Sequence, residues 1–130
     1  MSFFTKEQYL KLCENGKSQN PKADFPPVVK LHIPGTPCAW LISEMVCPVR
    51  NLAWGLYNMM GCIPLFGYID LTELAKANSQ SYSRVEVDRS FEGKYPMSVY
   101  LAAAKMCDKV TDKEIVLQKL YAKYLMEIRT

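Results

Sequence analysis

The fold is decided by residues 28–45, VVKLHIPGTPCAWLISEM. In residues 28–33, apolar side chains alternate with Lys30 and His32, which is the period of a strand with two unlike faces. Residues 34–38, PGTPC, are typical of a turn. Residues 39–45 alternate again. The pattern predicts a β-hairpin in which both strands carry apolar side chains.

Two further apolar runs follow the hairpin, LAWGLYNMM at residues 52–60 and PLFGYIDL at residues 64–71. Four strands in succession with short connections predict an antiparallel meander. Gly55 and Gly67 lie inside these runs, and each indicates either a bulge or the close approach of another side chain. Residues 84–91, RVEVDRSF, are predicted to form a fifth strand.

Helices are predicted on both sides of the strand region, at residues 5–16, 71–77, 96–107 and 111–128. Thr5 and Gln8 have the spacing of a capping box, and Asp70 and Thr111 are expected to cap two of the other helices. The sequence therefore predicts an α+β fold. We expect an antiparallel meander sheet of four to five strands, with the N-terminal helix and the two C-terminal helices packed on one face of it.

Size and composition predict a single domain over residues 1–130. The chain has 130 residues, of which 49% are hydrophobic, and this is enough for one core. The net charge is only +3, and acids are interleaved with bases, so a dedicated duplex-binding protein is not indicated.

The five cysteines are odd in number and include no CxxC pair, which indicates free thiols in a reducing compartment. We find no signal peptide pattern and no apolar run long enough to span a membrane. We therefore expect a cytoplasmic protein without a membrane partner, a metal or another cofactor.

The segment SRVEVDRSFEGKYP, residues 83–96, carries the most suggestive charges. Glu86 and Asp88 lie two residues apart on a predicted strand, about 6.6 Å at the backbone, which is within the range of inverting glycosidase pairs. However, Arg84 and Arg89 flank both acids and favour their ionised forms, which removes the general acid. We interpret Arg84, Glu86, Asp88 and Arg89 as a protein-contact patch or a salt-bridged strand face. A small hydrolase that uses Glu86 and Asp88 is an alternative.

The single histidine, His32, shares a strand face with Lys30. In some hairpin registers Lys30 faces Glu44 in a cross-strand ion pair. A nucleophilic Cys–His pair stays open, because no sequence feature brings a particular thiol to His32.

Aromatic residues gather in the predicted strands, at Trp40, Trp54, Tyr57, Phe66 and Tyr68. Such residues can stack on single-stranded bases, but residues 51–75 contain no Lys or Arg, so we interpret the aromatics as core. A nucleic-acid-binding accessory protein is the alternative function. Its contacts would come from Lys30, His32, Arg50, Arg84 and Arg89.

The last predicted helix carries an apolar stripe that includes Tyr121 and Tyr124. Tyrosine is a favoured anchor at protein interfaces. The stripe either packs on the sheet or serves for partner binding, including a homodimer through this helix.

The order of short motifs resembles a bacterial family catalogued as domain of unknown function 2958. The matching stretches are Val28 to Pro34, Trp40 to Glu44, Trp54 to Leu56, Gly67 to Leu74, and Glu86 to Phe91. The resemblance covers about residues 3–107, and the helix at 111–128 is an addition. His32 stands where an aromatic residue is usual, and EVDRSF replaces a tighter Glu-Arg-Asp run.

The resemblance implies an accessory protein of phages, plasmids and other mobile elements, and no catalytic chemistry is attached to the pattern. We therefore expect a non-enzymatic binding protein that docks on a host or defence-system protein. In concrete terms, we expect an inhibitor of a bacterial defence complex, of the antirestriction or anti-CRISPR type.

Overall fold

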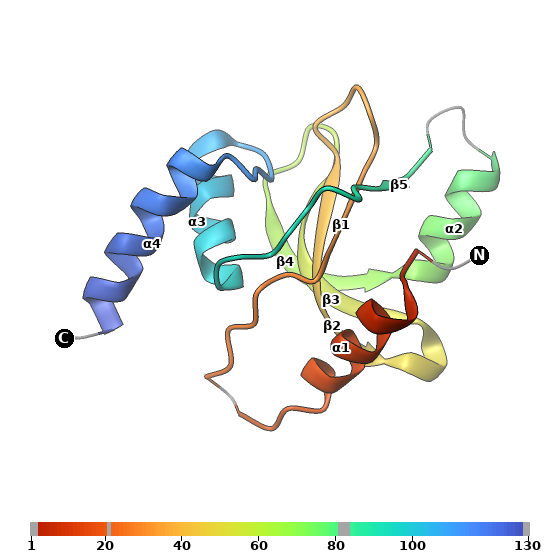
Figure 1. Cartoon of the computed structure of the whole chain (residues 1–130). Helices are drawn as coiled ribbons and strands as arrows, with labels where there is room; N and C mark the ends of the chain where they lie inside the picture. The colour runs from red at the N-terminus through yellow and green to blue at the C-terminus, as the bar shows by residue number, and fades with distance from the viewer. Residues whose placement is uncertain (1–2, 21, 81–83, 129–130) are drawn as a thin grey trace.

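The computed structural model describes residues 3–20, 22–80 and 84–128 (Figure 1). In chain order its elements are α1 (Lys6–Gly16), β1 (Val29–His32), β2 (Ala39–Cys47), the 3-10 helix η1 (Pro48–Arg50), β3 (Leu52–Asn58), β4 (Leu65–Asp70), α2 (Leu71–Gln80), β5 (Glu86–Val87), α3 (Met97–Cys107) and α4 (Glu114–Ile128). The predicted α+β class is confirmed. No helix in these ranges has both the length and the apolar character needed to cross a membrane.

The five strands form one antiparallel sheet in the order β4-β3-β2-β1-β5. Strands β1 to β4 follow one another as the predicted meander. Strand β5 pairs with the free side of β1 and is only two residues long. The two edges of the sheet are therefore β4 and β5.

Helices cover both faces of this sheet, so the expectation that they pack on one face is wrong. Leu31 lies opposite Trp40 in a core cluster that also contains Leu12 of α1. Leu41 lies opposite Leu56 in a second cluster, with the inner side chains of α3. Because neighbouring residues of β2 are buried on opposite faces, each face needs its own cover.

The N-terminal helix is fixed to β2 where that strand is irregular. The register between β2 and β3 shifts between Ile42 and Glu44, which is the signature of a bulge at Ser43. The buried Asn15 side chain donates to the Ser43 carbonyl at 2.9 Å. A Cβ on Gly16 would lie 1.9 Å from the Met45 carbonyl oxygen, so only glycine lets the helix end lie this close to the strand. The capping box predicted at the other end of α1 is confirmed.

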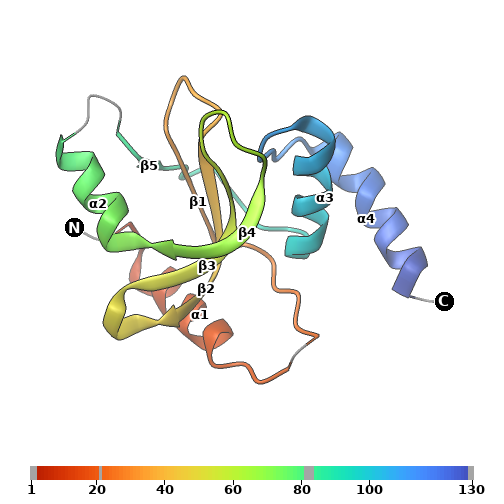
Figure 2. The ribbon, with the colours of Figure 1, turned by 180° about the vertical axis from the view of Figure 1, so that it is seen from behind.

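Helix α3 covers one face of the sheet, and α4 packs against α3. Helix α4 lies outside α3, away from the sheet (Figures 1 and 2). It begins at Glu114, three residues later than predicted; the buried Thr111 side chain accepts from the Lys113 N–H at 3.3 Å in the loop before the helix. Leu117, which is 1% exposed, is the one fully buried residue among the described residues of α4.

Candidate protein-docking surface

The charged segment around β5 has the predicted alternation. Val85 and Val87 contribute to the core cluster on the α1 side of the sheet. Glu86 lies opposite His32 of β1, on the other face. The strand predicted over residues 84–91 is shorter than expected, because only Glu86–Val87 pair with β1 as a strand; Asp88 follows it and donates its N–H to the Lys30 carbonyl.

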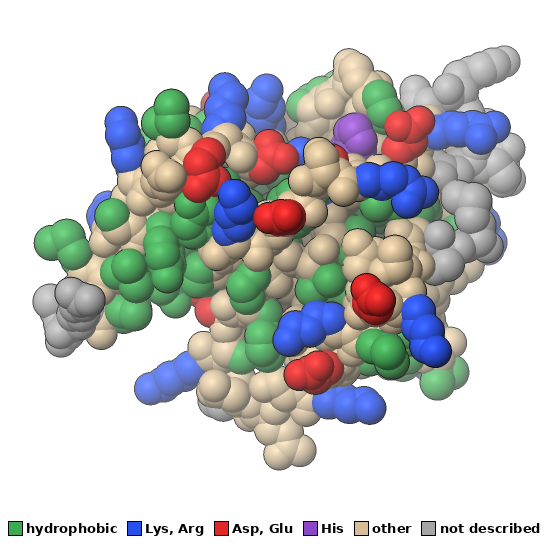
Figure 3. All heavy atoms as spheres, in the orientation of Figure 1, with side chains coloured by type: hydrophobic (Ala, Val, Ile, Leu, Met, Phe, Trp, Pro, Cys, Tyr) green, Lys and Arg blue, Asp and Glu red, His purple; other side chains and the backbone are tan. Residues whose placement is uncertain are grey.

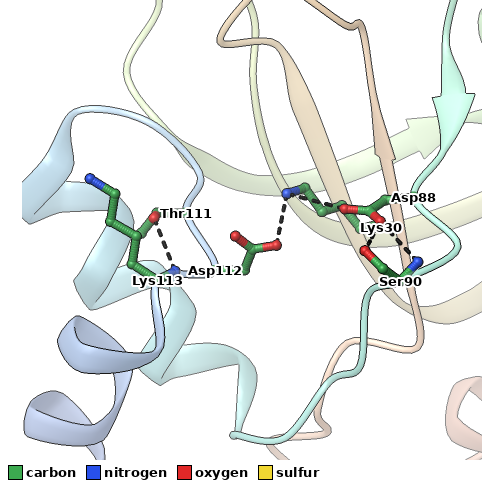
Figure 4. A network of polar contacts seen from close by, with 6 residues as sticks. All are labelled: Lys30, Asp88, Ser90, Thr111, Asp112 and Lys113. Carbon is green, nitrogen blue, oxygen red and sulfur yellow. Dashed lines mark hydrogen bonds and ion pairs between the residues drawn. The ribbon is translucent and has the colours of Figure 1, made fainter.

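Asp88 belongs to a network of polar contacts that joins three segments (Figure 4). Its carboxylate accepts from the Ser90 N–H at 3.0 Å and from the Ser90 hydroxyl at 2.7 Å. The Lys30 ammonium, whose side chain is 14% exposed, lies 3.7 Å from Asp88 and 3.0 Å from Asp112. Lys30 thus ties β1 both to the chain after β5 and to the loop before α4.

This network holds Asp88 in its charged form. The Ser90 hydroxyl and N–H, together with the positive charge of Lys30, lower the pKa of the Asp88 carboxyl against the opposing effect of burial. A carboxyl with a lowered pKa is a poor general acid at neutral pH. We interpret Asp88 and its partners as a structural network that holds β1 to the two neighbouring segments.

The cation beside Asp88 is Lys30, whereas the sequence suggested Arg84 and Arg89. Arg84 and Arg89 are exposed, and neither takes part in the ion pairs between described residues. The suggested pair of Lys30 with Glu44 is also wrong, because Lys30 lies opposite Leu41 and Glu44 lies opposite Trp54. Burial raises the pKa of Glu44.

The structure does not pair His32 with Cys38, and no metal site forms in the part of the chain that it describes. His32 lies opposite Ala39, whose side chain belongs to the α3-side cluster. Cys38, the cysteine nearest in sequence, is buried in the cluster on the other face. No group of three His, Cys, Asp or Glu side chains in residues 3–20, 22–80 and 84–128 could hold a metal ion.

The cations of the nucleic-acid alternative do not form one patch. Lys30 is engaged by two carboxylates. Arg50 lies in η1, between β2 and β3, whereas Arg84 and Arg89 flank β5 beyond β1. The arrangement lacks the continuous basic groove that would follow a nucleic-acid backbone.

The sheet aromatics divide into two groups. Trp40 is buried, as the core interpretation required, and Tyr57 packs against the same cluster. The rings of Phe66 and Tyr68 lie 6.3 Å and 5.2 Å from that of Trp54, and both side chains are exposed. The core interpretation is therefore wrong for these two residues of β4.

The two tyrosines predicted as interface anchors lie where α4 meets α3. The Tyr121 ring stacks on Tyr124 at 6.0 Å and lies 5.1 Å from Tyr95. The Tyr95 hydroxyl donates to Glu114, and this bond, more than burial, raises the pKa of Tyr95 to about 12. Burial, with the nearby Asp24 carboxylate, also raises the pKa of Tyr124. Both anchors are half-buried, so the stripe packs partly on the protein itself.

A groove of about 200 Å³ runs between α3 and α4. Its lining is apolar with a charged rim, formed by Ser98, Val99, Ala102, Leu120, Lys123, Tyr124 and Glu127. Beyond the groove, the apolar side chains of Ile115, Met126 and Ile128 are exposed on the same helix. Figure 3 shows hydrophobic side chains gathered over α4. We call this groove and the three exposed side chains the α4 surface.

These features define a small α+β protein whose exposed apolar side chains are its candidate binding surface. A family model described as "Protein of unknown function (DUF2958)" matches residues 3–111, most of the chain. The chain therefore belongs to this family, as the motif order indicated. The matched range ends before α4, so the α4 surface is formed largely by residues outside it. No curated protein and no solved structure matches the chain.

Proposed function

We propose that this protein has no catalytic activity and acts by docking its α4 surface onto another protein. The observation that carries the proposal is the exposure of large apolar side chains along α4, where Met126 is 71% exposed. Exposed apolar patches rimmed by polar side chains are typical of protein interaction sites, and hydrophobic side chains gather over α4 in Figure 3. The half-buried Tyr121 and Tyr124 of the same helix resemble the rigid aromatic anchors of such sites.

The groove gives the surface a shape that a partner can fill. Its apolar floor comes from Val99, Ala102 and Leu120, and Lys123 and Glu127 stand at the rim. We infer an apolar side chain of the partner in the groove and polar contacts around it. The mobile-element context implied by the family resemblance makes a host protein, above all a bacterial defence complex, the target class of this proposal.

Affinity capture from bacterial lysate, with and without nuclease, tests this function. We expect one stoichiometric protein partner that survives nuclease treatment and is lost in Met126→Lys. The matched control is Val49→Lys, because Val49 is a 96% exposed apolar residue in η1, outside the α4 surface. This control should retain the partner. Recovery of nucleic acid alone, or equal capture by wild type and Met126→Lys, would contradict the proposal.

A further inference from the structure

The two edges of the sheet differ in how they are protected from pairing with another strand. Strand β5 has two residues and is flanked by charged side chains, which are common devices against edge pairing. Strand β4 has six residues, LFGYID, and pairs with β3 in an unbroken register. It contains no Lys, Arg or Pro. In Figure 2, β4 is the strand nearest the viewer, and no other described element crosses in front of it.

The backbone direction of β4 follows from the neighbouring strands. The Ile42 carbonyl accepts from Val28, so Ile42 turns its main-chain groups toward β1. Ile42 lies opposite Gly55, which must therefore turn its own groups away from β2 and toward Gly67 of β4. Because this direction alternates along a strand, the N–H and C=O groups of Phe66 and Tyr68 point outward from the sheet.

A second contact supports the same assignment. The N–H of Leu71, at the end of β4, donates to the Asn51 carbonyl on the β3 side at 3.1 Å. Leu71 and Gly67 are an even number of residues apart, so both direct their main-chain groups toward β3. The outward groups of Phe66 and Tyr68 therefore form an open hydrogen-bonding edge.

The side chains on this edge are apolar and exposed on both faces. Phe66 and Tyr68, the latter 61% exposed, lie on the face of Trp54, and Leu65 is exposed on the opposite face. Gly67 leaves room on that opposite face for the Tyr57 ring, which would lie 3.1 Å from an added Cβ. The close side-chain approach expected at this glycine is thus confirmed, and aromatic cover of an edge glycine is a known stabilising device.

We propose that β4 pairs antiparallel with β4 of a second copy of this chain, and that the two sheets become one across a twofold axis at Gly67. In this register Phe66 lies opposite Tyr68 of the second copy, and each pair exchanges both main-chain hydrogen bonds. Aromatic residues directly opposite each other are favourable cross-strand pairs. The strand therefore complements itself in hydrogen bonds and in side chains.

Charge and topology also fit a second copy. No charged residue lies within residues 65–69, so the paired strands bring no like charges together. Asp70 falls opposite Pro64 of the second copy. The strand runs from the β3–β4 turn to α2, so an antiparallel pair places the exposed Met60 and Ile63 of each turn alongside α2 of the other copy. Those side chains enlarge the apolar contact beyond the strand itself.

Sedimentation velocity over a wide concentration range tests the proposal. We expect wild type to reach twice the monomer mass of 14.9 kDa and Tyr68→Lys to remain monomeric. Tyr68→Pro should also be monomeric and folded, because the N–H that proline lacks points outward and has no partner among the described residues. Met126→Lys is the matched control, and its dimer should persist. A wild type that stays monomeric, or a dimer lost in Met126→Lys and kept in Tyr68→Lys, would overturn the proposal.

Amide hydrogen exchange tests the same strand in wild type, without any substitution. The amides of Phe66 and Tyr68 should become protected as protein concentration rises. Those of Gly67 and Ile69, which bond to β3, should be protected at every concentration. Rapid exchange of Phe66 and Tyr68 at concentrations where the protein is dimeric would place the interface elsewhere.

Discussion

Asp88 shows how a carboxylate in a suggestive position becomes a structural group. Its contacts with Ser90 and Lys30 lower its pKa below that in the unfolded chain, so the folded state binds this proton less tightly. Such a group stabilises the fold at pH values above its unfolded pKa of about 3.9, and its contribution is lost as pH falls through the folded pKa. Acid should therefore weaken the contact of β1 with the chain that follows β5.

Asp88→Asn keeps an oxygen for Ser90 but removes the charge facing Lys30. We expect it to lower the free energy of unfolding at pH 7 by about 1 kcal/mol, the scale of a partly exposed ion pair. The difference from wild type should shrink below about pH 4, where the wild-type carboxylate begins to be protonated. Urea unfolding between pH 7 and pH 3 measures this difference in the free energy of unfolding. The exposed Glu92→Gln is the control, and a difference for Asp88→Asn that does not change with pH would refute the argument.

At the scale of elements, the local patterns were sufficient for most of the fold. The alternation in residues 28–45 and the turn PGTPC predict the β1–β2 hairpin, and Thr5 with Gln8 predicts the start of α1. Both are signals contained within a few residues of sequence. The two-sided cover of the sheet was missed, although Trp40 and Leu41 are both apolar and must face opposite ways in a strand. That signal was present in the sequence and would have predicted a helix on each face.

Contacts between distant segments could not be predicted in the same way. Asn58 is buried, and both groups of its side-chain amide are used. The NH₂ group donates to the Pro37 carbonyl at 2.9 Å, and Oδ1 accepts from the Val110 N–H at 2.8 Å. Its partners lie in the β1–β2 turn and in the loop before α4. No local pattern connects these three positions. For the same reason, the pairing of Lys30 with Asp112 follows from the fold and from no motif.

Helix α4 is attached more weakly than the elements that it covers. Among its described residues, Leu117 alone is fully buried, while Leu120, Tyr121 and Tyr124 are partly covered. A chain that ends at residue 113 keeps the sheet, α1 and α3. We expect it to unfold cooperatively with a free energy of unfolding lower by at least about 3 kcal/mol, because this is the upper end for burial of one leucine and three further side chains lose their partial cover. Urea denaturation followed by circular dichroism measures this. Absence of a cooperative transition would show that α4 is indispensable to the core.

At the scale of the whole molecule, the charges are dispersed. Lys and Arg side chains alternate with Asp and Glu over the face shown in Figure 3. Arg50 lies in η1 between β2 and β3, whereas Arg84 and Arg89 flank β5, and the charge of Lys30 is paired with Asp88 and Asp112. A binding mode that depends on neutralising many phosphates therefore has few cations to use at once.

Binding to a labelled single-stranded oligonucleotide, followed by fluorescence anisotropy, separates the docking function from the nucleic-acid alternative. At physiological salt we expect binding no tighter than the nonspecific range, a Kd of about 10⁻⁴ to 10⁻⁶ M, with a shallow dependence on salt because few counterions are released. Arg84→Ala combined with Arg89→Ala should change it little. Tighter binding that falls steeply with salt and is abolished in this double variant would make the β5 arginines nucleic-acid ligands. The exposed aromatic rings of β4 would then be candidates for base stacking.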